Sequence, residues 1–256
     1  MANATFNAGI DYFGLETGSS NKIKVKSSAE NRSKQSTSGA NSYGDAAVVD
    51  SWGDTAAPSA EYDVVDTITQ AVFPALGSLT TTTGMGGPVV LGTVTINTQN
   101  GSAPTIAASG QMVQAGAAQL RSYTLPALSV LARHRAQDFM GLCTFKIGAN
   151  DASDVEDYGL EAVSATFPIE ITLAQPKGDL KTYDLHGGMA TCQYTMNWYA
   201  ATAPTIALSA AATALGATMS EPVTKACPEG GYTQYTWTVA FPLVGEEYTP
   251  SAQNNG

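Results

Sequence analysis

The segment YGLEAVSATFPIEITLAQPKGDLKTYDLHGGMATCQYTMNWYA, residues 158–200, holds the longest uninterrupted strand patterns in the chain. From 191 to 199 the odd positions are polar, and the even positions are apolar or aromatic: Cys192, Tyr194, Met196 and Trp198. Such alternation is typical of a strand with one face in water. Residues 162–174 are rich in β-branched side chains, with Pro168 indicating a bulge or an unpaired edge, and Pro-Lys-Gly-Asp at 176–179 favours a turn. The segment therefore predicts a β-meander.

Comparable patterns predict further strands at residues 60–69, 89–98, 142–147 and 231–244. The sequence PALSVLARHRAQDF, residues 126–139, predicts the only substantial helix, because proline suits a first helical position and apolar residues recur at helical spacing. We therefore expect a mainly β fold, an antiparallel β-sandwich or barrel with one flanking α-helix. A single domain is expected over residues 1–256, with a flexible tail at 250–256 and no clear fold for much of 70–125.

Composition limits the function. Only 13% of the 256 residues are charged, about half the usual share of roughly 25%. Thr, Ser, Gly, Ala and Asn must therefore cover much of the surface, which suits packing against copies of the same chain. The net charge of −10 argues against gripping nucleic acid, since that requires a basic surface. No apolar run is long enough to span a bilayer, and the start of the chain lacks a signal-peptide layout.

The polar segment at residues 27–45 is the main candidate for an interaction site. It has almost no apolar side chain, so we expect either a mobile loop or an extended hairpin without a core of its own. Basic residues precede acidic ones here, which fits an ordinary solvated hairpin or an arm that reaches a neighbouring subunit. The candidate subunit-interface residues are Lys22, Lys24, Lys26, Arg32, Lys34, Asp45, Asp50 and Asp54.

Signs of catalysis are scarce. The sequence has no G-x-S-x-G motif, and only His134 and His186 could supply an imidazole. The acidic loop at residues 150–157 could ligate calcium, but its spacing does not match an EF-hand, and an ordinary acidic loop is the simpler interpretation. The three cysteines lack CxxC spacing, which favours reduced thiols over a zinc site or a disulfide framework. We therefore expect no enzyme activity, catalytic residue, cofactor or metal.

The stretch KIKVKSSAENRSKQSTSGANSYGDAAVVDSWGD, residues 22–54, followed by APSAEYDVV at 57–65, resembles the opening of bacteriophage tail tube proteins and related virion structural proteins. In that family a basic-to-polar strand or loop precedes a Gly-Asp turn, here Gly44-Asp45, and then an apolar strand, here residues 46–49. The resemblance covers about a quarter of the chain.

The resemblance implies a β-barrel-like subunit that self-associates, commonly as hexameric rings stacked into a hollow tube. Genomic DNA would pass through the lumen without specific binding, and other virion proteins would be partners, with no membrane involved. The implied location is the phage tail, after assembly in the host cytoplasm. Alternatives are a head–tail joining, tail terminator or capsid decoration protein. Outside that class we keep a hydrolase and a carbohydrate-binding or adhesin module with a sugar platform on aromatic strands, at Tyr232, Tyr235 and Trp237.

Overall fold

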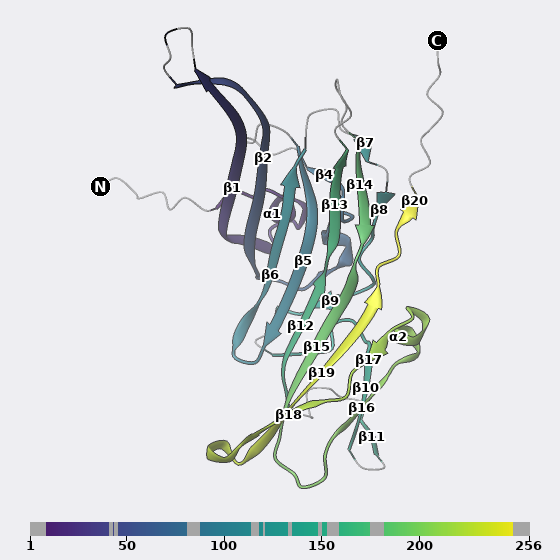
Figure 1. The fold of residues 1–256 in the computed structure, drawn as a ribbon. Helices are drawn as coiled ribbons and strands as arrows, with labels where there is room; N and C mark the ends of the chain where they lie inside the picture. Colours follow the sequence, from purple (N-terminus) through teal and green to yellow (C-terminus); the bar gives the residue numbers. More distant parts are fainter. Residues whose placement is uncertain are drawn as a thin grey trace, which may run out of the picture.

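The computed structural model describes residues 9–40, 43, 46–80, 88–113, 118–119, 121–132, 135–147, 150–152, 159–174 and 182–247. These residues form a mainly β, sandwich-like fold built from antiparallel strand pairs, with one short parallel exception (Figure 1). The helices among them are α1 (Leu15–Gly18) and α2 (Ala210–Ala214), together with the 3-10 turns η1 (Gln70–Val72) and η3 (Pro228–Gly230). The predicted antiparallel β class is confirmed.

One large sheet forms the first layer and runs through most of the molecule (Figure 1). In spatial order its strands are β1 (Ile23–Ala40), β2 (Ala46–Val64), β6 (Ser102–Met112), β5 (Val89–Gln99), β12 (Leu160–Phe167), β15 (Met189–Trp198), β19 (Tyr232–Pro242) and β17 (Thr218–Met219). Two more strands pair outside this path, namely β18 (Val223–Cys227) with β19 and β4 (Leu79–Thr80) with β5. All of these pairs are antiparallel.

Several small sheets and their connecting segments form the second layer. One sheet joins β10 (Cys143–Ile147), β11 (Asn150–Ala152) and β16 (Thr205–Leu208), and another joins β13 (Ile169–Ala174), β14 (Thr182–Gly187) and β7 (Ala118–Gln119). Two-stranded pairs connect β20 (Glu246–Glu247) with β8 (Arg121–Ser122) and β3 (Ile68–Thr69) with β9 (Ser129–Val130). Their apolar side chains belong to the same core cluster as the large sheet.

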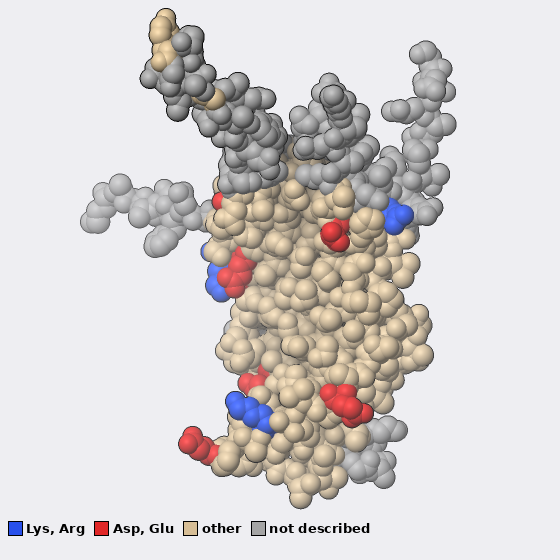
Figure 2. Space-filling view, viewed as in Figure 1, with Lys and Arg blue, Asp and Glu red and all other residues tan. Residues whose placement is uncertain are grey.

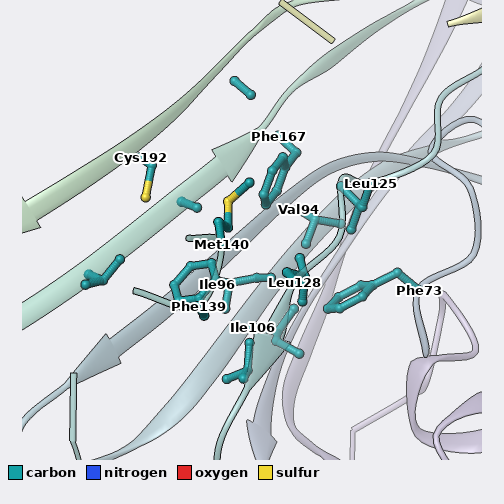
Figure 3. Packing of buried hydrophobic residues seen from close by; sticks show 14 of the residues in the cluster. Phe73, Val94, Ile96, Ile106, Leu125, Leu128, Phe139, Met140, Phe167 and Cys192 are labelled. Carbon is teal, nitrogen blue, oxygen red and sulfur yellow. The ribbon is translucent and has the colours of Figure 1, made fainter. Parts of the chain in front are cut away.

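Strand alternation decides which residues form that core. On β15 the even positions predicted to be apolar, Cys192, Tyr194 and Met196, are fully buried, whereas their polar neighbours lie on the opposite face. Figure 3 shows the strand residues Val94 and Ile96 close to side chains from connecting segments: Phe73, Leu128, Phe139 and Met140. Burial of each large apolar side chain stabilises the fold by about 1.5–3 kcal/mol. We call this side of the large sheet the inner face and the other side the outer face.

The two long strands of the predicted meander each break in the middle. Pro168 separates β12 from β13, and Gly188 separates β14 from β15. The Gly188 N–H donates a hydrogen bond to the Pro168 carbonyl at 3.0 Å, and a Cβ on Gly188 would lie 2.9 Å from that oxygen. Only glycine allows this close approach. The break therefore falls at the same level in both strands, and β13 and β14 lie in the second layer.

The helix predicted at 126–139 is wrong. Residues 126–132 and 135–139 contain no helix; Ser129 and Val130 form β9 instead. The Leu128 backbone is bound on both sides, because its N–H donates to the Gln70 side chain and its carbonyl accepts from the Gln70 N–H. The Ser129 N–H also donates to the Phe139 carbonyl at 2.9 Å. Pairing with β3 and burial of alternate residues therefore override the local helix propensity.

Two aspartates attach irregular segments to buried tyrosines of the large sheet. Asp11 accepts hydrogen bonds from the Leu15 and Thr17 backbones and from the Tyr62 hydroxyl, the last at 3.1 Å. Asp138 accepts a 2.8 Å hydrogen bond from the Tyr194 hydroxyl, together with bonds from three backbone N–H groups: those of Met140, Leu142 and Cys143. Each carboxylate therefore organises a loop and fixes it to a core strand at once.

Candidate assembly interface

The strands β1 and β2 form a long ribbon that rises past the neighbouring strands (Figure 1). Their register runs from Ile23 opposite Val64 to Ala40 opposite Ala46. Only residues 59–63 of β2 pair with another strand, β6, so the rest of the ribbon has two strands among the described residues. Of the two forms predicted for residues 27–45, the extended hairpin is therefore confirmed for 27–40. We define residues 31–57 as the outer ribbon.

Three irregularities interrupt the ribbon's register, between Val25 and Ser27, Ser33 and Gln35, and Thr37 and Ser38. Bulges of this kind increase local twist and are common at sheet edges, where they limit unwanted strand pairing. The second of them contains Lys34 and lies opposite Asp54 and its neighbour Gly53. The outer ribbon is therefore an edge whose regular pairing segments are short.

The three lysines predicted to meet a neighbouring subunit all have partners within the chain. The Lys24 ammonium lies 3.0 Å from Glu16, and the Lys26 ammonium lies 3.1 Å from Glu61. The Lys22 ammonium donates to the Thr67 carbonyl at 3.1 Å. These contacts lie at the base of the ribbon, so they help to fix its position on the sheet. Whether the lysines also contact another subunit stays a prediction.

The remaining predicted interface residues lie farther along the ribbon. The Arg32 backbone is opposite Ala56, and the Asp50 backbone is opposite Thr37. Asp54 lies in β2 near the Lys34 irregularity. For these four residues the structure describes the backbone only, and Asp45 lies outside the described residues. The structure thus places all four of these residues on one strand pair and brings the Lys34 and Asp54 backbones to one level.

Glu16 anchors the ribbon edge from α1. One of its carboxylate oxygens accepts the Val25 N–H at 3.1 Å, and the other contacts Lys24. The Val25 hydrogen bond, followed by the Lys24 hydrogen bond, lowers the pKa of Glu16. A carboxylate with a depressed folded-state pKa stabilises the fold above its unfolded pKa, near 4.3, and loses this contribution as the pH falls through the folded value.

We therefore expect Glu16→Gln to destabilise the chain by about 1 kcal/mol or less at pH 7, because the carboxylate is partly exposed. The difference between Glu16→Gln and the unchanged protein should shrink as the pH falls below about 4. Urea unfolding of both proteins at several pH values would measure it. A difference that stayed constant down to pH 2 would contradict the electrostatic explanation.

The opposite edge of the large sheet also carries exposed strands. β17, Ser220 and β18 follow one another along β19, and the Ser220 N–H donates to the Thr238 carbonyl at 2.9 Å. The first four residues of β18 are exposed, and Val223 is 70% exposed. The path from β1 to β17 has eight strands, because two of the ten lie off it. With every pair antiparallel, the two edge strands run in opposite directions.

The outer face of the sheet is polar but almost without charge in its centre. The cross-strand register places neutral residues side by side from β6 to β19: Thr105, Asn97, Ser164, Gln193 and Thr238 in one row, and Ala107, Thr95, Thr166, Thr191 and Ala240 in the next. Figure 2 shows this face, with a broad central area that carries no acidic or basic residue. Small side chains also leave a shallow hollow of about 460 Å³ across the four strands from β1 to β5.

The described residues offer no evident reaction centre. Burial raises the pKa of the Cys143 thiol to about 12 and also raises that of Cys192, so both stay protonated at neutral pH. No cluster of three metal-ligating side chains occurs in the ranges that the structure describes. Of the acidic loop at 150–157, only 150–152 are described, and they form β11. His134 lies outside the described residues, whereas His186 is exposed on β14.

The aromatic strand residues divide between core and surface. Trp237 is 3% exposed and stacks on Tyr235, with ring centroids 5.6 Å apart. The pair therefore belongs to the inner side of the sheet and does not offer an open sugar platform. Tyr232 behaves differently, because its ring lies against Tyr199, which is 70% exposed. Sequence alternation could place Tyr232 on the outer face, but it gave no sign of its partner Tyr199, which directly follows β15.

The fold and its edges define a class of protein: an antiparallel β-sandwich with an extended two-stranded ribbon and a broad uncharged sheet face. Neither a known protein family nor a curated protein matches this sequence. No helix among the described residues is long and apolar enough to cross a membrane.

Proposed function

We propose that this chain is a phage virion structural subunit, most specifically the tail tube subunit, which self-assembles into stacked rings around a DNA-conducting channel. The observation that carries the proposal is the outer ribbon. A two-stranded ribbon in water is marginally stable by itself, and this one pairs with no third strand of its own chain among the described residues. A neighbouring copy of the subunit would supply the missing contacts.

The two edges of the large sheet support ring formation. Because β1 and β17 run in opposite directions, copies in the same orientation can meet edge to edge and continue the sheet with antiparallel pairing. Such a contact joins different surfaces of two copies, so it is heterologous, and it closes into a ring when the rotation between copies allows. The ribbon, projecting past the sheet, can then contact a neighbour in the same or the adjacent ring.

The uncharged outer face supports a channel. A surface that lacks lysine and arginine across β6, β5, β12 and β15 offers few charge contacts to phosphate. The net charge of −10 also repels the phosphate backbone of DNA. If this face lines the lumen, DNA can pass without being held. The same ribbon and edges also suit a head–tail joining, tail terminator or capsid decoration protein, and these stay the alternatives.

Electron microscopy of the purified full-length chain tests the proposal, together with light scattering across a concentration series. We expect rings that stack into tubes with a central channel. Isolated rings that never stack would favour the joining or terminator alternatives. A monodisperse monomer at every concentration up to the solubility limit would contradict self-assembly altogether.

A further inference from the structure

A second exposed cluster lies on the outer face where β15, β19 and β18 end. The register pairs Asn197 with Gln234 and Gln234 with Lys225, so these three side chains form one row across the strands. Tyr232 lies two residues from Gln234 and hence on the same face, paired with Cys227. Tyr199, which follows Asn197 by two positions, extends this second row, as its contact with Tyr232 shows.

The two tyrosines form an exposed aromatic pair. Their ring centroids are 5.4 Å apart, with an angle of 58° between the planes. Tyr199 is 70% exposed although a large aromatic ring gains free energy from burial. On its other side, the Tyr232 backbone is opposite Cys227 on β18. The pair is thus positioned by its own strands and keeps one ring largely open to solvent.

Two amide side chains lie in the row next to the pair. The Gln234 amide donates to the Asn197 side-chain oxygen at 3.2 Å, which fixes the orientation of both amides. Glu161 on β12 follows Leu160, which is opposite Met196, and its carboxylate acts electrostatically on Tyr232. The two amides can donate and accept hydrogen bonds, and the carboxylate can accept them, as required to recognise neighbouring hydroxyl groups.

We propose that the Tyr199–Tyr232 pair, with Asn197, Gln234 and Glu161, is a binding site for a neutral glycan. One face of a pyranose ring carries mainly C–H groups, which pack against an aromatic ring, while its hydroxyl groups point outward toward polar partners. The cluster supplies both components within two adjacent cross-strand rows. The site is separate from the ribbon and does not depend on the proposed assembly.

The charges favour a neutral ligand over an acidic one. Glu161 would repel a uronic acid or sialic acid, and Lys225 supplies a single compensating positive charge in this row. The net charge of the chain, −10, adds a long-range repulsion. Neutral hexose or N-acetylhexosamine chains are therefore the expected class.

Binding of the full chain to immobilised oligosaccharides, followed by biolayer interferometry, tests this site. The probes are cello-, malto-, xylo- and chito-oligosaccharides, with oligogalacturonate as the acidic comparison. We expect at least one neutral probe to bind and Tyr199→Ala to weaken it about tenfold or more, whereas Tyr199→Phe keeps most of the affinity. Gln234→Ala should weaken binding, and Gln193→Ala, an exposed glutamine elsewhere on β15, should not.

Two results would overturn the proposal. One is the absence of binding to every neutral probe in the set. The other is neutral-probe binding that Tyr199→Ala leaves unchanged; if that variant also loses self-association by light scattering, the tyrosine pair is a contact between copies. Failure of tube formation in the intact protein would leave the glycan result intact, so the two proposals fail separately.

Discussion

Removal of most of the outer ribbon is expected to leave a folded subunit that no longer assembles. The change replaces residues 33–55 with Asn-Gly, so that Arg32 and Ala56, which are already opposite each other, flank a two-residue turn. This design spares the base of the ribbon, where β2 pairs with β6 and Ser28 accepts the Ile10 N–H at 2.7 Å. Deleting residues 28–41 instead would remove Ser28 and leave β2 without its partner.

The expected loss is large because the ribbon contributes backbone groups to assembly. Ordering a residue costs about 1–2 kcal/mol, and a ribbon without a core cannot offset this alone. Strand pairing with a neighbour can offset it, so deleting the ribbon should abolish tubes and rings under the electron microscope. Circular dichroism and urea unfolding should show a folded monomer. Tubes indistinguishable from those of the intact protein would show that the ribbon is not needed.

A charge-reversed ribbon is the matched control. Arg32→Glu with Lys34→Glu keeps the backbone of the ribbon and changes only its side chains. Exposed ion pairs contribute about 0–1 kcal/mol each and are screened by salt. This variant should therefore assemble, with a weakening that is clear at low salt and small at high salt. If it fails at every salt concentration, the arginine and lysine side chains matter more than strand pairing.

The strand patterns in the sequence predicted the fold class well for a physical reason. In the 191–199 segment every second side chain packs into the core, and the side chains between them lie on the other face of the sheet. The period-two pattern and the structure therefore agree. The 126–139 segment failed because its structure depends on distant groups. Proline, leucine and alanine favour a helix locally, but Gln70 and β3 bind the backbone in an extended form.

The candidate sites were only partly predictable. The polar composition of residues 27–45 indicated a loop or an extended hairpin, and the structure places residues 27–40 in a two-stranded ribbon. The pairing of Tyr199 with Tyr232 depends on the register of β15 with β19, which no local pattern specifies. The same is true of Asp138 and Tyr194, whose contact joins a loop to a strand far along the chain.

Loss of the Asp138 carboxylate should be among the most destabilising single changes in the chain. The carboxylate accepts the Cys143 N–H at 3.1 Å and the Met140 and Leu142 N–H groups at 3.3 Å each, besides the Tyr194 hydroxyl. Burial raises the pKa of Tyr194, so its hydroxyl remains a donor at neutral pH. Removing the acceptor leaves four donors without this partner in a mostly buried loop.

We therefore expect Asp138→Ala to lower the free energy of unfolding by about 3–5 kcal/mol, since unsatisfied buried donors cost about 1–3 kcal/mol each and water can reach part of the loop. Tyr194→Phe removes one donor and should cost about 1–2 kcal/mol. Asp66→Ala is the matched control, because Asp66 is exposed and accepts only from its neighbour Thr67 in the described structure; it should change stability by about 0.5 kcal/mol or less.

Urea unfolding measures all three variants, at a concentration where light scattering shows a monomer, because assembly would otherwise add to the apparent stability. In the double variant, Asp138→Ala with Tyr194→Phe, the two losses should not add, since both remove the same hydrogen bond. Stability would then fall by less than the sum of the single changes. Strict additivity, or an Asp138→Ala effect as small as that of Asp66→Ala, would show that the loop is held by its buried Phe139 and Met140 side chains and not by the carboxylate.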